Sequence, residues 1–318
     1  MILDIGIFLA GIGLLIGGAW LLVRGGTQVA AVLGVPTVVV GLTVVAFGTS
    51  APELFVSLVG ALRGNSGLVL GNVVGSNVAN LGLILALAAI LRPIIVDRSL
   101  IRWNGEVPLM LAATAGMMWL VRDGVLSRLD ALLLVIGFVV FMTVALKSGR
   151  SVVDAPEGFE AAAPGHRIRQ SVLGSLMVLG GIVGLAGGGH LIVSSALGLA
   201  TRLGVSETLI GLTLVAVGTS LPELATTVMA AIQKQNDLAL GNIIGSNLFN
   251  ILAVAGPVGL IHDLAAESGM QTQLLSMGGI TLGVSLLLIF GRGRFGRTRG
   301  SLVLIAYVAI TALWVTGT

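Results

Sequence analysis

The chain has 318 residues, of which 56% are hydrophobic and only 10% are charged, and its mean hydropathy is +1.07. Its 17 basic and 14 acidic residues leave a net charge of +3, so the pI of 10.2 does not indicate nucleic-acid binding. A water-soluble domain needs far more charged surface. Apolar runs long enough to cross a hydrocarbon core of about 30 Å recur along the chain. The sequence therefore predicts an all-α, multi-pass membrane protein whose main partner is the lipid bilayer.

Ten transmembrane helices are expected, and the first is read as a retained helix because no basic leader or small-residue cleavage site precedes it. Spans two and seven are too long for one straight crossing and each contains Gly-Thr-Ser-x-Pro-Glu at mid-length, so both are predicted to be interrupted there. The expected spans are residues 5–23, 29–62, 67–91, 104–121, 129–146, 171–196, 205–232, 238–261, 271–290 and 300–317.

Basic residues predict the orientation. With the N-terminus outside, thirteen of the 17 lysines and arginines fall in inside loops and four in outside loops. We therefore expect a protein of the cell (inner or plasma) membrane with both termini extracellular or periplasmic. A hydrophilic linker at 147–170 separates a first five-helix unit, 1–146, from a second, 171–318.

Spans one and six are rich in glycine. They contain Gly13-x-x-x-Gly17 and Gly184-x-x-x-Gly188, a spacing that lets helices approach closely. The pattern is compatible with stable packing and with a smooth surface on which these spans slide. His190 in span six is expected to be a packing or cavity residue.

The chain matches itself without gaps at an offset of 170 residues. Each half holds five spans, an odd number, so the second half enters the membrane from the opposite side and the two units are inverted repeats. Inverted repeats with interrupted helices are a transporter architecture in which substrate binds where the repeats meet. The matching segments are 17–23 with 187–193, 41–53 with 211–223, and 71–80 with 241–250.

Glu53 and Glu223 are the only acidic residues deep within spans, and they occupy equivalent positions of the repeat. A carboxylate inside a membrane is costly and indicates function by default, the alternative being a protonated or hydrogen-bonded packing residue. Pro52 and Pro222 cannot donate a backbone hydrogen bond, so each frees a carbonyl one turn earlier. A cation is one partner that replaces the lost hydrogen bond, and an ordinary kink solvated by Ser and Thr is the other reading.

Further oxygen atoms surround these glutamates in the sequence. Asn80 and Asn250 each follow a serine, Ser76 or Ser246, by four residues, so each pair shares one helix face. Asn77 and Asn247 are expected to hydrogen-bond the broken helices instead. The remaining hydroxyl and carbonyl candidates in the broken turns are Thr49, Ser50, Thr219 and Ser220.

The chemistry of this set favours calcium. Ca²⁺ binds six to eight oxygen ligands, whereas transition metals prefer imidazole or thiolate. Cysteine is absent, which also excludes disulfides, and two of the three histidines lie outside the spans. Two carboxylates neutralise one divalent or two monovalent cations, as an exchanger requires. No cofactor and no catalytic residue is expected, because the sequence has no nucleophile–base pair or cofactor motif, and a channel is disfavoured by the inverted repeats. Nothing indicates a protein partner.

The duplicated Gly-Thr-Ser-x-Pro-Glu and Gly-Asn-x-x-Gly-Ser-Asn blocks resemble the two alpha-repeats of the sodium/calcium exchanger family, within the cation/calcium antiporter superfamily. The likeness covers essentially the whole chain and is closest to the prokaryotic type, which has a short central loop. It implies exchange of Na⁺ for Ca²⁺ by alternating access, with spans one and six sliding across a rigid remainder.

The resemblance also implies roles for individual residues. Glu53 and Glu223 become shared calcium and sodium ligands, and the carbonyls of Thr49 and Thr219 complete the calcium site. The side chains and carbonyls implied at flanking sodium sites are those of Ser50, Ser76, Ser220, Ser246, Ala46 and Ala216.

Two departures bear on ion selectivity. Potassium-dependent exchangers and some prokaryotic members carry Asp where this chain has Asn250, and the missing carboxyl argues against potassium co-transport. Proton/calcium exchangers have an acidic residue inside the Gly-Asn block, where this chain has Val73, Val74, Ile243 and Ile244. Sodium is therefore the favoured counter-ion, with a proton-coupled calcium or cation antiporter as the alternative.

Overall fold

A computed structural model describes residues 2–102, 105–148, 164–202, 216–267, 269–291 and 293–316. The described first half contains α1 (Ile2–Leu33), α2 (Thr37–Val40), α3 (Ala46–Thr49), α4 (Ala51–Leu62), α5 (Ser66–Ala79), α6 (Leu85–Leu91), α7 (Glu106–Leu120) and α8 (Arg128–Ser148). The described second half contains α9 (Pro164–Arg202), α11 (Ala216–Thr219), α12 (Leu221–Ile232), α13 (Asn236–Phe249), α14 (Gly256–Gly259), α15 (Met270–Ile289) and α16 (Arg297–Thr316). In the described residues three π-helical segments join helices into longer rods: η1 (Gly41–Val45), η2 (Asn80–Ile84) and η4 (Asn250–Ala255).

The described residues form an all-α membrane protein. Six helical rods are long and apolar enough to cross a bilayer, and the rod of α2, η1 and α3 forms a seventh with α4, to which it is joined at a 46° bend. The observed ends of most rods lie within three residues of the predicted ones. Much of the predicted linker and the first part of span seven, residues 149–163 and 203–215, lie outside the described part of the chain.

The predicted boundary between the first two spans is wrong. The helix does not end at 23 but continues to Leu33, so Arg24 is a helical residue whose guanidinium stacks 5.0 Å from the Trp20 ring centre. Nothing in residues 24–28 ends the helix, because the segment contains no proline and Gly25 packs inside the helix against α9. The chain turns instead at Gly34, whose φ of +67° suits glycine, followed by Pro36.

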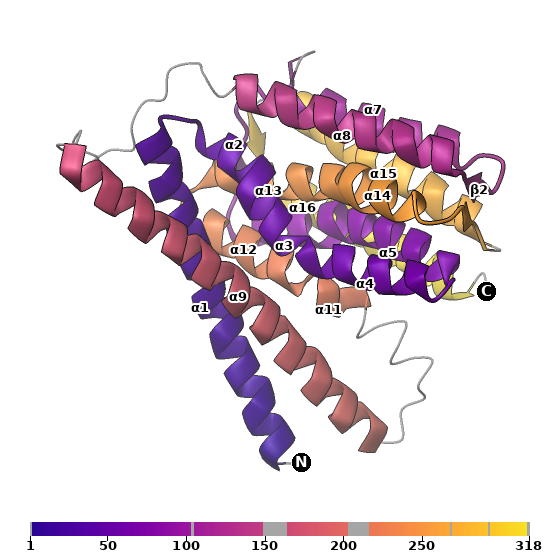
Figure 1. Cartoon of the computed structure of the whole chain (residues 1–318), viewed down its shortest axis with the longest axis horizontal. Helices are drawn as coiled ribbons and strands as arrows, with labels where there is room; N and C mark the ends of the chain where they lie inside the picture. The colour runs from indigo at the N-terminus through magenta and orange to yellow at the C-terminus, as the bar shows by residue number, and fades with distance from the viewer. Residues whose placement is uncertain are drawn as a thin grey trace.

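The long helices α1 and α9 run side by side and extend away from the other helices (Figure 1). They are antiparallel and pack backbone against backbone, because a Cβ on Gly18 would lie 2.7 Å from the Leu185 nitrogen and one on Gly188 2.6 Å from the Leu15 nitrogen. Six of the interface glycines recur at intervals of seven residues: Gly11, Gly18 and Gly25 on α1, and Gly174, Gly181 and Gly188 on α9.

The predicted glycine contact is therefore only partly correct. Gly184 and Gly188 do lie at the interface, but a Cβ on Gly13 or Gly17 would meet nothing within 4 Å. His190 is exposed on α9, so the expectation that it is a packing residue is wrong, while the cavity alternative stays a prediction.

Two short sheets, which the sequence did not predict, tie the ends of the remaining helices together. β1 (Ile94–Ile95) pairs antiparallel with β4 (Arg294–Phe295), and β2 (Val125–Leu126) pairs antiparallel with β3 (Leu264–Ala265). Each sheet joins a loop of the first half to a loop of the second. The main apolar core is formed by the rods of α5, η2 and α6 and of α13, η4 and α14, against which α7, α8, α15 and α16 pack.

The packing of α1 on α9 predicts opposite effects for two adjacent substitutions. Gly18→Ala should lower the melting temperature of the detergent-solubilised protein, because its methyl group overlaps the α9 backbone at a cost of about 1–3 kcal/mol. Gly17→Ala is the matched control: it adds the same methyl group on the open side of the helix and should leave the melting temperature unchanged or slightly raised. Equal behaviour of the two variants in thermal unfolding would contradict this packing.

Candidate ion-binding site

Both broken spans are interrupted at the serine of Gly-Thr-Ser-x-Pro-Glu, as predicted. Ser50 has φ −85° and ψ 5°, and Ser220 has φ −88° and ψ 3°, so neither continues a regular helix. The proline that follows lies in the first turn of the next helix, where its missing N–H removes no helical hydrogen bond. Glu53 and Glu223 occupy the same first turns of α4 and α12, where exposed backbone N–H groups favour negative charge.

The two glutamates are bridged by serines of the opposite half of the chain. The Ser50 hydroxyl donates to Glu223 Oε1 at 2.9 Å, and the Ser220 hydroxyl donates to Glu53 Oε1 at 3.4 Å. Each carboxylate is 1% exposed, and the second oxygen of each, Oε2, has no hydrogen-bond partner among the described residues. The two charges are close enough to repel each other. The arrangement leaves two buried carboxylate oxygens available to a cation.

Threonine hydroxyls complete the surroundings of the carboxylates. Thr219 contacts Glu53, while Thr49 and Ser246 contact Glu223. Thr49 Oγ1 is also 3.3 Å from the Ala46 carbonyl and 3.4 Å from Ser246 Oγ. The Ala46 carbonyl further accepts from the Ser50 backbone N–H at 2.9 Å, so this predicted sodium ligand already has two protein partners.

Asn80 and Asn250 are buried beside the broken helices. Asn80 donates to Asn247 Oδ1 at 3.3 Å and keeps its own side-chain oxygen unpartnered among the described residues. Asn250 is fully buried, and neither atom of its amide has a partner there. Leaving a buried amide unpaired costs about 1–3 kcal/mol, so both oxygens are suited to a bound ion or its water.

Of the remaining predicted residues, Ser76 and Ser246 are buried on α5 and α13, one turn before these asparagines. Ala216 is the first described residue of α11. The structure thus brings carboxylates and hydroxyls from both halves together around the two breaks.

The prediction for Asn77 and Asn247 is wrong. Among the described residues their amides donate to methionine sulfur atoms rather than to the broken helices, Asn77 to Met277 Sδ at 3.7 Å and Asn247 to Met110 Sδ at 3.6 Å. These methionines lie on α15 and α7, far away in sequence, so no local pattern pointed to them.

The broken helices are held by Asn72 and Asn242, which were not among the predicted residues. Asn72 donates to the Glu53 carbonyl at 3.0 Å and to Ser57 Oγ at 2.9 Å. Asn242 donates to Thr227 Oγ1 at 3.0 Å and accepts from Thr49 Oγ1 at 3.2 Å, so it links α12 to α3. Both are the first asparagine of the duplicated Gly-Asn-x-x-Gly-Ser-Asn block, and this repetition could have identified them in the sequence.

Two glycines explain how α13 comes so close to the first broken span. A Cβ on Gly241 would lie 2.6 Å from the Val38 carbonyl oxygen, and one on Gly245 2.7 Å from the Leu42 carbonyl oxygen. The contacted rod contains η1, and the asparagines of the site begin η2 and η4. Single π-helical turns of this kind are frequent at functional sites because they rearrange backbone hydrogen bonds.

Oxygen atoms dominate the chemistry of this site. In the described part of the chain no group of three or more His, Cys, Asp and Glu side chains comes together. Hard cations such as Ca²⁺ bind carboxylate, hydroxyl, amide and carbonyl oxygens in flexible geometry.

The sequence profile of the family described as sodium/calcium exchanger protein matches residues 3–147 and 173–316. The chain belongs to this family. It is 33% identical over 339 residues to the sodium/calcium exchanger MaX1 of Methanosarcina acetivorans, covering 95% of this chain and 96% of MaX1. It is 35% identical over 266 residues to the inner membrane protein YrbG of Escherichia coli, with 82% of this chain and 81% of YrbG covered.

Solved structures agree with this assignment. The sodium-calcium exchanger NCX_Mj, in crystals soaked with 10 mM Na⁺ and no Ca²⁺, superposes with a TM-score of 0.87 at 32% identity, covering 98% of each chain. Crystals of NCX_Mj soaked with 2.5 mM Na⁺ and 10 mM Sr²⁺ give a TM-score of 0.86. The chain is therefore a multi-pass membrane transporter of the cation/calcium antiporter type, and the predicted family is confirmed.

The contacts of Asn242 predict a positioning role. Asn242→Leu should weaken the apparent calcium affinity about tenfold, because the buried hydroxyls of Thr49 and Thr227 lose their partner. Asn236→Leu, at the start of the same helix, is the control and should keep the native affinity. The measurement is calcium-concentration dependence of exchange in proteoliposomes. Native affinity in Asn242→Leu would exclude the role, and a loss of maximal rate without a change in affinity would assign it to folding or translocation.

Proposed function

We propose that this chain exchanges Na⁺ for Ca²⁺ by alternating access, with both ions bound between the two broken spans. The observation that carries the proposal is the pair of buried carboxylates, each bridged by a serine of the opposite half and each with one unpartnered oxygen among the described residues. Two negative charges balance one Ca²⁺ or two Na⁺, so the same site suits either ion in turn.

Sodium as the counter-ion is supported by the relatives and by the surroundings of the site. MaX1 is named a sodium/calcium exchanger, and NCX_Mj crystals were soaked with Na⁺ and Ca²⁺. Val73, Val74, Ile243 and Ile244, at the positions where proton/calcium exchangers carry an acid, are at most 1% exposed in the apolar core. A carboxylate introduced there would be buried away from water.

We further propose ten transmembrane helices in two inverted five-helix repeats. Contacts between and within the two halves support this, because adding 170 to a residue number of the first half, or subtracting 170 from one of the second, converts one contact into another. Ser50–Glu223 becomes Ser220–Glu53, and the bond between Asn72 and Ser57 becomes that between Asn242 and Thr227. The pairing of β1 with β4 likewise becomes that of β3 with β2, to within one residue.

For the moving part we propose α1 and α9. Both present glycine backbones to each other, and α9 also contacts the two broken turns, since side chains on Gly48 and Gly218 would overlap Ile182 and Val193. A shift of α9 along these flat contacts would open the site to one side and close it to the other. The positive-inside count supports outside termini, although Arg24 now belongs to a helix.

The ligand assignments are proposals of the same kind. Glu53 and Glu223 bind both ions, with carbonyls of Thr49 and Thr219 added for calcium. The residues proposed for sodium and for completing the shell are Ser50, Ser76, Ser220, Ser246, Asn80, Asn250, Ala46 and Ala216.

Radiocalcium uptake into proteoliposomes tests this function. An outward sodium gradient should drive uptake, and a proton gradient alone should not. Glu53→Gln and Glu223→Gln should each abolish the uptake while the protein remains folded and inserted, because an amide keeps the volume but removes the charge.

Equal uptake under a pure proton gradient would contradict sodium coupling and favour the proton-coupled alternative. Native exchange in either glutamine variant would remove that glutamate from the site. Asp130→Asn, a change on the α7–α8 hairpin away from the breaks, serves as the carboxylate control and should retain exchange.

A further inference from the structure

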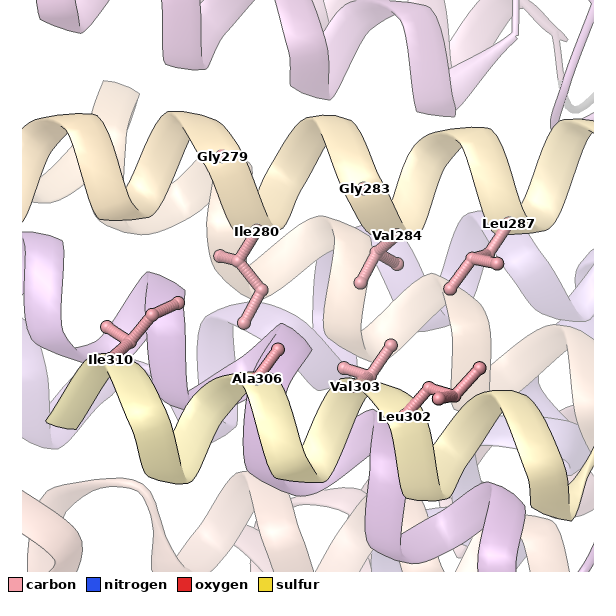
Figure 2. Close-up of a pocket in the computed structure, with 9 residues that line it drawn as sticks. All are labelled: Gly279, Ile280, Gly283, Val284, Leu287, Leu302, Val303, Ala306 and Ile310. Atoms are coloured by element: carbon pink, nitrogen blue, oxygen red, sulfur yellow. The ribbon is translucent and has the colours of Figure 1, made fainter. Parts of the chain in front are cut away.

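The hairpin of α15 and α16 carries an apolar groove of about 210 Å³. Figure 2 shows side chains of the two helices facing each other across it. The lining residues are Gly279, Ile280, Gly283, Val284 and Leu287 of α15, and Leu302, Val303, Ala306 and Ile310 of α16.

Two glycines one turn apart leave this groove open on the α15 side. A Cβ on Gly279 or Gly283 would meet nothing within 4 Å, so neither position is filled by a neighbouring side chain. At the edges, Leu282 is 51% exposed and Leu302 is 56% exposed. From Leu302 to Ile310 the groove follows α16 for about 12 Å. In a membrane protein, an exposed apolar groove of this length is in contact with lipid acyl chains.

One end of the groove is bordered by arginines. Arg299 precedes Leu302 by three residues and so lies on the same face of α16, one turn away. Its Nη1 donates to the carbonyls of Gly291 and Arg294, and Arg297 Nε donates to the Ile90 carbonyl at 3.1 Å. These bonds hold the guanidinium groups in place but leave their charges unbalanced.

No acidic residue on this segment offsets the charge. From residue 268 to the end, the sequence contains four arginines and no Asp or Glu. Asp97 lies on the connection after β1, where its carboxylate accepts from the Ser99 backbone N–H at 2.6 Å and interacts with the charge of Arg102 rather than with an arginine of this segment. Hydrogen bonds from Ser99, with a smaller contribution from Arg102, keep the pKa of Asp97 below its usual value. Arg294 and Arg297 themselves are exposed.

The hairpin of α7 and α8 provides a comparison within the same molecule. Its connection carries Arg122 and Arg128 but also Asp123, with Asp130 in the first turn of α8, so its charges balance. It also contains an open glycine, Gly116, where an added Cβ would meet nothing within 4 Å. Both hairpins therefore have a glycine that faces open space, but of the two only the α15–α16 hairpin also has a net positive charge on its connection.

We propose that the α15–α16 groove binds an anionic phospholipid, with one acyl chain between the helices and the phosphate at Arg294, Arg297 and Arg299. The apolar lining suits the chain, and the unbalanced arginines suit a negative headgroup more than a zwitterionic one. A basic residue near a membrane surface contributes about 1 kcal/mol, or roughly fivefold, to the binding of an anionic lipid.

Native mass spectrometry of the full-length protein in detergent tests the proposal. Titration with phosphatidylglycerol and phosphatidylcholine of identical acyl chains should show at least tenfold tighter binding of phosphatidylglycerol. Arg294→Gln/Arg297→Gln should weaken phosphatidylglycerol roughly 25-fold and leave phosphatidylcholine unchanged. Gly283→Leu and Ala306→Leu, which fill the groove, should weaken both lipids.

Matched variants on the other hairpin, Gly116→Leu and Arg122→Gln, should bind both lipids as the native protein does. Calcium exchange and melting temperature report whether each variant is folded. Equal affinity for the two lipids in the native protein would overturn the headgroup assignment. Native phosphatidylglycerol affinity in folded Gly283→Leu and Ala306→Leu would overturn the groove.

Discussion

Glu53 and Glu223 are each 1% exposed, and the hydrogen bonds that the described residues offer them come from neutral groups, namely serine and threonine hydroxyls and their own backbone N–H groups. Burying an unpaired carboxylate is strongly unfavourable, so this pair requires either a proton or a cation. The breaks and the crossing serines place these two charges together. Each break puts its glutamate in the first turn of a helix, and each serine bonds to the glutamate of the opposite half.

Glycine provides the close contacts that such a site needs. Gly241 and Gly245 let α13 lie directly against the first broken span, while Gly18, Gly181 and Gly188 do the same between α1 and α9. The first set fixes the geometry of the site, since Asn242 on the same helix bridges Thr49 and Thr227. The second lets α1 and α9 pack backbone against backbone, and α9 in turn contacts the two broken turns at Gly48 and Gly218.

The broken helices and the paired glutamates could be predicted because their sequence motifs occur in both halves of the chain. The breaks at Ser50 and Ser220 follow from proline chemistry, and the two glutamates stand out as charges within apolar spans. The predictions that failed concern features that depend on contacts between segments distant in the sequence. The sulfur partners of Asn77 and Asn247, the strand pairing of the loops and the choice of Gly18 rather than Gly17 at the interface are set by tertiary packing. The partners of Asn77, Asn247 and the loop strands lie in distant segments, so no local pattern predicts them, whereas the seven-residue spacing of Gly11, Gly18 and Gly25 was a signal that the Gly13–Gly17 motif obscured.

The most direct test of the site is a crystal structure of the protein grown with calcium, with data collected to reveal anomalous scattering from the ion. The account predicts one calcium between α4 and α12, with oxygens of both Glu53 and Glu223 at about 2.3–2.6 Å. An anomalous peak that touches only one of these carboxylates, or that lies elsewhere in the molecule, would contradict it.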